Sequence, residues 1–365
     1  SKFFPSIFII LVLKFIVIFV QIIFLENSLN LTSSSINFKA LDSIEKIIIH
    51  FSLALSFKGY KVTIYNRANH ENTNRDVVWK NISDLNNDEA DILIIFQDIE
   101  LLKYKVKAKI KFLFLHYKPT EELDNNLLVN LINKKFCILY SNNYLISKLP
   151  HNFNYVPKIH FKLGVDDIYR ETKIFNSQYS NVFVTTHPAK GLDWLLDLWL
   201  KYIHPKVPWA ELHIYSKLLN QSKTTNNIKI RNLKLTLELN KNCGIVVKQP
   251  LPQNKFVSEL AKYKLHLCPS TDNDVQYLSI LESQAIGIPV VARETGSLYE
   301  CIYNSETGYI VKDKENFARK VIQVLSDNKL FFTLSNNSKL NNHVISWKDV
   351  VRNFERKLNE NTFYR

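Results

Sequence analysis

The stretch from residue 267 to residue 300 reads LCPSTDNDVQYLSILESQAIGIPVVARETGSLYE. Its apolar pattern predicts the end of a strand at 265–267, then a polar loop, a helix over 278–286 that ends at Gly287, and a buried strand over 289–292. This is one strand-helix-strand unit, which is typical of a parallel sheet covered by helices. The stretch therefore indicates an α/β fold.

Two acidic residues flank the start of the predicted helix. Asp274 lies in the loop before the helix, and Glu282 follows eight residues later on the helix itself. At the carboxyl end of a parallel sheet, free amides and the helix dipole favour an anion at such a helix N-terminus. The amides between the two acids belong to Tyr277, Leu278 and Ser279. We therefore expect an anionic ligand at the start of this helix.

These residues resemble the signature of the family-4 retaining glycosyltransferases, which have the two-domain GT-B fold. The signature is an acid, seven residues, a glutamate, and then a Gly-x-Pro-Val-Val and a Gly-x-x-x-Glu segment. Here it reads Asp274-x7-Glu282, Gly287-Ile-Pro-Val-Val and Gly296-Ser-Leu-Tyr-Glu300. The first acid is usually glutamate, and aspartate reaches one methylene less far. A solvated charge would explain an isolated glutamate, but the length and order of the match favour the signature.

The resemblance implies two Rossmann-like, doubly wound domains that face one another across a cleft. It also implies a C-terminal helix that crosses back to the first domain. We expect an apolar N-terminal extension over 1–19, an acceptor-side domain over 20–170, a nucleotide-sugar-binding domain over 171–340 and the returning helix over 341–365. A chain of 365 residues is long enough for two such domains.

The resemblance also assigns roles to residues outside the central stretch. His116 follows the strand predicted over 110–115, where the family places a functional histidine close to the reacting sugar; an ordinary loop histidine is the alternative. Lys190 and Gly191 match a Lys-Gly or Arg-Gly pair whose cation meets the donor diphosphate. The implied catalytic residues are His116, Lys190 and Asp274, and the implied donor-binding residues are Lys190, Gly191, Asp274, Tyr277, Leu278, Ser279 and Glu282.

Four further positions depart from the family pattern. Asp42 and Ser43 stand where the family has two glycines at a helix start, which puts close approach to a donor phosphate in question, although both residues are also good helix caps. Val184 stands where many members have an arginine, and Leu163 replaces an asparagine before the second domain. The aspartate at 274, the lost glycines at Asp42 and Ser43, and Val184 in place of arginine keep open a second class of function, an inactive module that binds a nucleotide sugar without transferring it.

The leading interpretation is a retaining hexosyltransferase. It would move a sugar from a nucleotide diphosphate sugar to an acceptor hydroxyl, in the synthesis of a cell-envelope or surface polysaccharide or glycolipid. Fixed amides and cations can stabilise the departing diphosphate in a closed cleft, so we expect no metal and no cofactor. An Asp-x-Asp metal motif at Asp272 is disfavoured because Asp274 already fills the family pattern. A sugar-nucleotide epimerase or phosphorylase on the same scaffold is the alternative within enzymes.

The composition indicates the partners. A net charge of +13 and a pI near 9.3 favour anionic partners. We expect a nucleotide-sugar donor, a saccharide or lipid-linked acceptor and an anionic membrane surface. Nucleic acid is disfavoured because no RNP-like aromatic motif, basic recognition helix or zinc-finger spacing is present.

The expected location is cytoplasmic, peripheral to or anchored at a membrane. The four cysteines are far apart and include no C-x-x-C pair, which fits a reduced compartment. Residues 3–20 are apolar except for Lys14 and nearly reach the length of a membrane-spanning helix. An apolar extension without a membrane role is the alternative.

Overall fold

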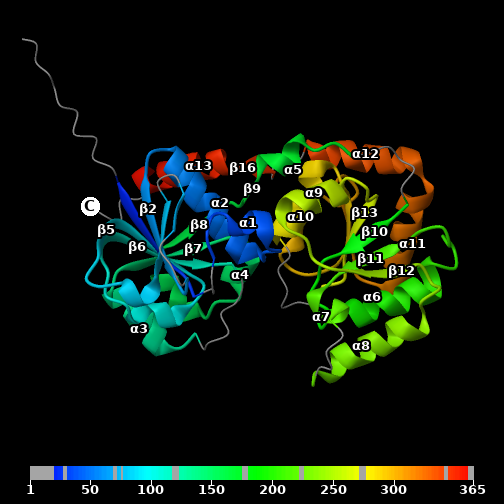
Figure 1. Cartoon of the computed structure of the whole chain (residues 1–365), viewed down its shortest axis with the longest axis horizontal. Helices are drawn as coiled ribbons and strands as arrows, with labels where there is room; N and C mark the ends of the chain where they lie inside the picture. Colours follow the sequence, from blue (N-terminus) through cyan, green and yellow to red (C-terminus); the bar gives the residue numbers. More distant parts are fainter. Residues whose placement is uncertain are drawn as a thin grey trace, which may run out of the picture.

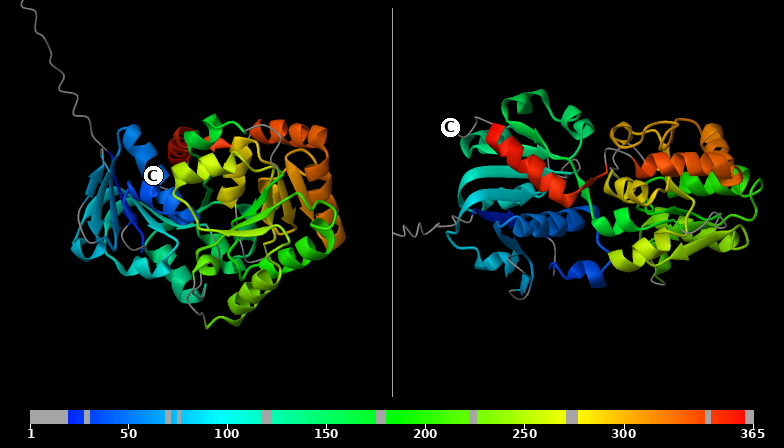
Figure 2. Two further views of the ribbon diagram at one scale, coloured as in Figure 1. Left: turned by 45° about the vertical axis from the view of Figure 1, so that its right-hand side comes forward. Right: turned by 90° about the horizontal axis from the view of Figure 1, so that it is seen from above.

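The computed structural model describes residues 20–27, 31–68, 72–74, 77–116, 123–174, 180–221, 226–270, 277–340 and 344–360. Within these residues the chain forms two α/β lobes that lie side by side (Figure 1), and two further views show the same division (Figure 2). Each lobe is built on its own sheet.

The first lobe holds an eight-stranded sheet. In sheet order its strands are β3 (Asn72–Asn74), β4 (Val77–Asn81), β2 (Lys61–Asn66), β1 (Gln21–Leu25), β5 (Glu89–Phe96), β6 (Lys107–Leu115), β7 (Phe136–Tyr140) and β8 (Lys158–His160). All neighbours are parallel except β3 and β4. In the centre, Phe24 of β1 lies in register between Ile64 of β2 and Ile94 of β5, and all three side chains are buried. Burial on both faces is expected for a parallel sheet that helices cover.

Helix α2 (Ser43–Phe57) carries the first-lobe residues that matter most for the site. It begins at Asp42, whose side chain accepts a hydrogen bond from the Glu45 amide at 2.9 Å, and the Glu45 carboxylate accepts one from the Asp42 amide at 2.9 Å. This reciprocal capping box satisfies two amides that a helix start leaves unpaired. It confirms that Asp42 caps this helix.

The second lobe holds a six-stranded, all-parallel sheet. In sheet order its strands are β12 (Ile245–Lys248), β11 (Leu212–Tyr215), β10 (Val182–Val184), β13 (Leu265–Cys268), β14 (Val290–Arg293) and β15 (Gly308–Val311). The predicted strand-helix-strand unit is confirmed as β13, α10 (Tyr277–Ile286) and β14, with limits that differ by one residue. The other main helices are α6 (Leu192–Leu198), α8 (Ile228–Leu239), α9 (Gln253–Leu260), α11 (Lys314–Ser326) and α12 (Asn328–Lys339).

The chain returns to the first lobe at its C-terminal end. Strand β16 (Ile345–Ser346) pairs with β9 (Gly164–Val165), and α13 (Trp347–Glu360) then packs on α2. The Phe354 ring lies edge-on to Phe51 of α2 at 5.5 Å. A Cβ on Gly164 would lie 2.8 Å from the Trp347 ring, so this crossing needs a glycine. The expected α/β architecture and returning helix are confirmed.

The predicted apolar extension over 1–19 lies outside the described residues. Where the structure is described, no helix has the length and apolar character needed to cross a membrane. The strands of the first sheet fall within residues 21–160, and those of the second within 182–311.

Candidate functional site

A cavity of about 300 Å³ lies between the two lobes. Its first-lobe wall is the start of α2 and the turn before it, and its second-lobe wall comes from the carboxyl ends of β10, β11 and β12 and from α9 and α10. Carboxyl ends of parallel strands are where ligands bind in open α/β sheets. The lining residues are Ala40, Leu41, Asp42, Ser43, Lys46, Thr185, His187, Tyr215, Pro250, Leu251, Gln253, Phe256, Ser279 and Glu282.

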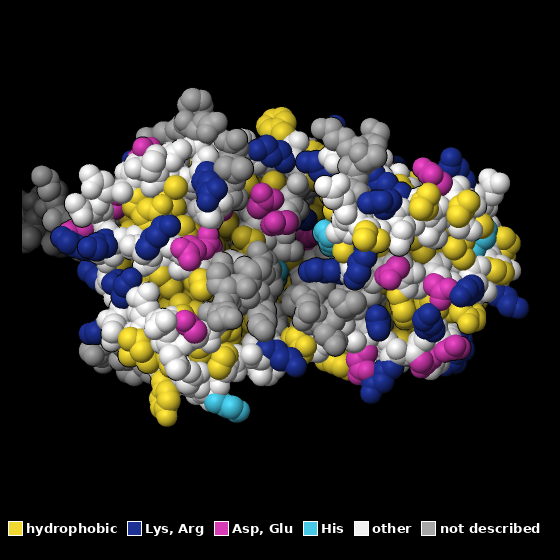
Figure 3. All heavy atoms as spheres, turned by 90° about the horizontal axis from the view of Figure 1, so that it is seen from below, with side chains coloured by type: hydrophobic (Ala, Val, Ile, Leu, Met, Phe, Trp, Pro, Cys, Tyr) yellow, Lys and Arg dark blue, Asp and Glu magenta, His cyan; other side chains and the backbone are white. Residues whose placement is uncertain are grey.

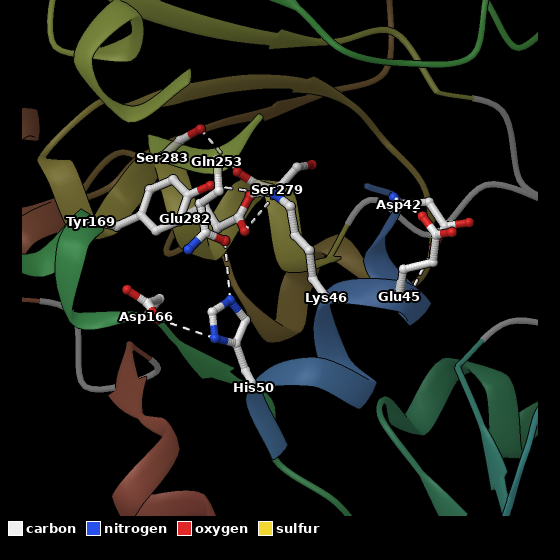
Figure 4. Close-up of polar contacts among 10 residues, drawn as sticks. All are labelled: Asp42, Glu45, Lys46, His50, Asp166, Tyr169, Gln253, Ser279, Glu282 and Ser283. Carbon is white, nitrogen blue, oxygen red and sulfur yellow. Dashed lines mark hydrogen bonds and ion pairs between the residues drawn. The ribbon is translucent and has the colours of Figure 1, made fainter. Parts of the chain in front are cut away.

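An ion pair crosses this cavity from one lobe to the other. Lys46 Nζ of α2 lies 2.8 Å and 2.9 Å from the two carboxylate oxygens of Glu282 on α10, and 3.3 Å from the Tyr169 hydroxyl (Figure 4). The two charged side chains are only 12% and 6% exposed. A carboxylate this deeply buried needs a counter-ion, because removing an ion from water costs several kcal/mol. Lys46 supplies it.

Lys46 is a site residue that the sequence analysis missed. It follows the capping box and lies in the first turns of α2, where a cation opposes the helix dipole unless an anion lies nearby. That signal could have singled it out. Its partner, however, lies 236 residues further along the chain, and only the packing of the two lobes brings them together.

A double-mutant cycle should detect the Lys46–Glu282 pair. Removing either partner leaves the other charge buried, so Lys46→Met and Glu282→Gln should not be additive in the free energy of unfolding, with a coupling of about 1–3 kcal/mol. Urea unfolding of the four proteins measures it. The matched control is Lys58–Glu355, a pair at 3.7 Å whose lysine is 54% exposed; its coupling should stay below about 1 kcal/mol. Equal coupling in the two cycles would contradict a buried pair.

His50 forms a second connection between the lobes. Its Nδ1 lies 3.1 Å from Asp166 Oδ2, and its Nε2 lies 3.0 Å from Gln253 Oε1 on α9 (Figure 4). Asp166 also caps the following short helix by accepting from the Ile168 amide. One histidine of α2 thus contacts the connecting segment and the second-lobe wall of the cavity.

The Gly-x-x-x-Glu motif from the sequence analysis forms a third connection between the lobes. The Glu300 carboxylate accepts hydrogen bonds from the backbone amides of Asn143 at 2.9 Å and Tyr144 at 3.1 Å. Gly296, in the same motif as Glu300, lies against the Tyr144 ring, and a Cβ there would approach ring carbons to 2.0 Å. The Gly-x-x-x-Glu segment of the second lobe therefore holds the Ser-x-x-Tyr turn (141–144) of the first.

His116 follows β6, as predicted, but does not line the cavity that holds Lys46 and Glu282. Its Nδ1 lies 2.9 Å from the Ser141 hydroxyl, and its amide donates to Gln97 Oε1 at 2.9 Å. The residue is 1% exposed, and this burial lowers the pKa of His116 to about 4. Its imidazole is therefore neutral at neutral pH.

The stability of the fold should decrease as the pH falls from 6.5 towards 4. An unfolded His116 binds a proton below about 6.5, whereas the folded pKa is about 4, so the unfolded state binds more protons in this window. The difference corresponds to about 3 kcal/mol when fully developed. Burial lowers the pKa of His266 to about 3, which adds to the effect. Urea unfolding against pH should give a smaller slope for His116→Asn than for wild type or for the exposed control His151→Asn; equal slopes would contradict it.

Lys190 and Gly191 immediately precede helix α6 of the second lobe. Gly191 has a positive φ of +94°, and a Cβ on it would come within 2.1 Å of the Pro269 carbonyl oxygen. This glycine therefore lets the start of α6 pack against the end of β13. The Lys190 amide donates to the carbonyl of His187 at 2.8 Å, and His187 lines the cavity.

The structure separates the predicted donor-binding residues of α10. The side chains of Tyr277 and Leu278 are buried, whereas Ser279 and Glu282 line the cavity. Tyr277, Leu278 and Ser279 are the first three residues of α10. Asp274, and Asp272 with it, lie outside the described residues.

Part of the cavity lining is aromatic and apolar. Tyr215 and Phe256 lie edge to face with ring centres 5.0 Å apart, and Pro250 and Leu251 also line the cavity. The sequence analysis did not assign a role to these four residues. The cavity lining thus offers an apolar surface for a ring as well as charged groups.

A metal centre is not evident in the part of the chain that the structure describes. No group of three or more His, Cys, Asp or Glu side chains there is arranged to hold a metal ion. The Asp272–Asp274 segment lies outside that part.

Comparison with known proteins identifies the class of fold. Residues 180–327 match the family model for glycosyl transferases group 1. Similar solved structures include sucrose-phosphate synthase from Thermosynechococcus elongatus, with a TM-score of 0.72, 12% identity, and coverage of 93% of this chain and 98% of that one. HepE from Anabaena in complex with UDP-glucose has a TM-score of 0.65 and 12% identity, with coverage of 93% of this chain and 100% of that one. WaaG, a glycosyltransferase involved in lipopolysaccharide biosynthesis, has a TM-score of 0.61 and 10% identity, with coverage of 94% of this chain and 100% of that one. A search of curated proteins finds no match.

The chain has the GT-B fold, with two Rossmann-like domains. The predicted resemblance to group 1 glycosyltransferases is confirmed, and the family match covers the second lobe from before β10 to the end of α11.

Proposed function

We propose that this chain is a retaining, metal-independent hexosyltransferase that uses a nucleotide diphosphate sugar as donor. The observation that carries the proposal is the cavity between the lobes, whose lining combines aromatic side chains with the buried carboxylate of Glu282 on α10. A nucleotide sugar has groups that these could bind: a flat base, ribose hydroxyls and a diphosphate. The similarity of this chain to HepE, whose structure was determined in complex with UDP-glucose, also supports a nucleotide-sugar donor.

In this arrangement each part of the donor has a partner. The base packs against Tyr215 and Phe256, the ribose hydroxyls donate to Glu282, and the diphosphate lies towards the helix starts of α6 and α10. A carboxylate can accept about four hydrogen bonds, so Glu282 can hold Lys46 and the ribose together. Lys46 then fixes the direction in which the carboxylate points.

The chemistry requires stabilisation of a leaving diphosphate. Lys190 and the first-turn amides of α10 would act most strongly as negative charge develops on it in a water-poor cleft. A neutral His116, hydrogen-bonded to the Ser141 hydroxyl, is proposed to offer the sugar a hydrogen bond and no charge. Asp274 is proposed to act beside the reacting sugar, as the resemblance implies.

The proposed acceptor is a saccharide or lipid-linked saccharide of the cell envelope, and the proposed location is the cytoplasmic face of a membrane. The net charge of +13 and the apolar residues 3–20 support attraction to an anionic bilayer. The similarity to WaaG, a glycosyltransferase involved in lipopolysaccharide biosynthesis, supports an envelope acceptor.

The alternative is a module that binds the donor without transferring the sugar. It is favoured by one observation: the capping box engages Asp42 where the family has glycines, so the α2 start does not provide their open backbone. The test is incubation of the purified protein with a panel of nucleotide diphosphate sugars. Release of a nucleoside diphosphate from one of them, abolished in Lys190→Ala, supports the transferase. Saturable binding without release would support the module, and an altered sugar on an intact nucleotide would indicate an epimerase.

A further inference from the structure

The segment from Lys217 to Asn242 is strongly basic. It contains six lysine and arginine residues and one acidic residue, Glu238. Its lysine- and asparagine-rich sequence predicts a polar loop with a helical stretch. The structure shows α7 (Lys217–Asn220) and the three-turn helix α8, which lies along the outer, lower side of the second lobe in Figure 1.

Helix α8 is apolar on two faces. Ile230 and Leu233 are buried, and Leu237 packs against the core of the second lobe. Ile228, Leu235 and Leu239 are spaced by seven and four residues, which places them on one other face of the helix. Those three side chains are 67%, 53% and 84% exposed. A soluble surface helix usually places polar residues on that face.

Basic residues border this outer face. Lys229 and Arg231 on α8, Lys217 on α7 and Lys241 after α8 are exposed. The neighbouring helix adds Leu218, which is 41% exposed. Figure 3 shows the molecule from the side on which α8 lies, with hydrophobic and basic side chains next to one another over the second lobe.

We propose that the outer face of α7 and α8 docks onto an anionic lipid bilayer. Apolar side chains in line with flanking cations are the pattern of a helix that lies in the plane of a membrane interface. The leucines favour lipid over nucleic acid, whose phosphate backbone requires the cations alone. Because the residues bordering this face are positively charged, an anionic bilayer is favoured over an uncharged apolar partner. This surface includes no residue that lines the donor cavity.

Vesicle binding by the full-length chain tests the proposal. The probes are vesicles of phosphatidylcholine with and without phosphatidylglycerol, and binding to the anionic ones should weaken with added salt. Leu235→Ser with Leu239→Ser should lower the partition coefficient about tenfold per leucine, because each loses burial of a large apolar side chain. The matched control is Leu340→Ser, which changes a leucine that is 78% exposed outside α8.

A site-specific reporter makes the outcome independent of total binding. Tryptophan emission should shift to the blue on anionic vesicles for Leu235→Trp and stay unchanged for Leu340→Trp. Wild-type vesicle binding by the double serine variant would overturn the proposal. Loss of vesicle binding only on deletion of residues 1–19 would also overturn it and would assign the binding to that segment. Concentration-dependent self-association abolished by the serine variant would show that a second copy covers this face. Release of nucleoside diphosphate should be unaffected by the α8 variants, so failure here leaves the proposed donor chemistry untouched.

Discussion

Lys190→Ala is expected to lower kcat about a hundredfold or more while changing donor affinity much less. The negative charge of the leaving diphosphate grows towards the transition state, so a cation at the start of α6 stabilises the transition state more than the bound donor. Removal of one preorganised donor at a developing charge costs about a hundredfold to a thousandfold in other enzymes. Steady-state kinetics and donor titration together give the two effects.

The control for Lys190 is Lys312→Ala, which removes a lysine of the same lobe that is 79% exposed. It should leave both constants unchanged. A Lys190→Ala enzyme with wild-type kcat and a raised KM would show uniform binding of donor and transition state, and would contradict the proposed role.

Glu282→Gln is expected to raise the dissociation constant of the donor about tenfold to a hundredfold. The amide keeps the size of the side chain but loses the charge that strengthens hydrogen bonds from the ribose. It also leaves the Lys46 ammonium without its buried partner. Calorimetric titration of the nucleoside diphosphate measures the change, and unfolding at the assay temperature must be excluded by a thermal melt.

The control for Glu282 is Glu315→Gln, an exposed glutamate of α11 outside the cavity wall. Its affinity should equal that of wild type. Unchanged donor affinity in a folded Glu282→Gln protein would refute contact between this carboxylate and the ribose.

The central strand-helix-strand unit could be predicted because its information is local. A buried strand, a glycine that ends a helix and a Pro-Val-Val strand are each fixed by neighbours within a few residues, and β13, α10 and β14 follow that pattern. The Asp42 cap was predictable for the same reason. Glu282 was found because it belongs to a long motif on that unit.

The partners of these residues could not be predicted, because they depend on the packing of the two lobes. Lys46 faces Glu282, and Glu300 holds the turn at Asn143, across more than 150 residues of sequence in each case. No periodicity encodes such a contact. His116 shows a related limit: its place after β6 was predicted, but the burial that keeps it neutral depends on Ser141 and the neighbouring strand.

Helix α8 was only partly recognised because its pattern is mixed. Leucine and isoleucine occur on two faces and lysine between them, so neither a single amphipathic face nor a loop describes the segment. The packing of Ile230 and Leu233 decides which face turns inward.

The most direct test of the proposed donor site is a crystal structure with a nucleoside diphosphate that the protein binds. We expect the base against Tyr215 and Phe256, the ribose hydroxyls on the Glu282 carboxylate with Lys46 beside it, and the phosphates at the starts of α6 and α10. Nucleotide bound outside this cavity, with Glu282 contacting only Lys46 and Tyr169, would contradict the account.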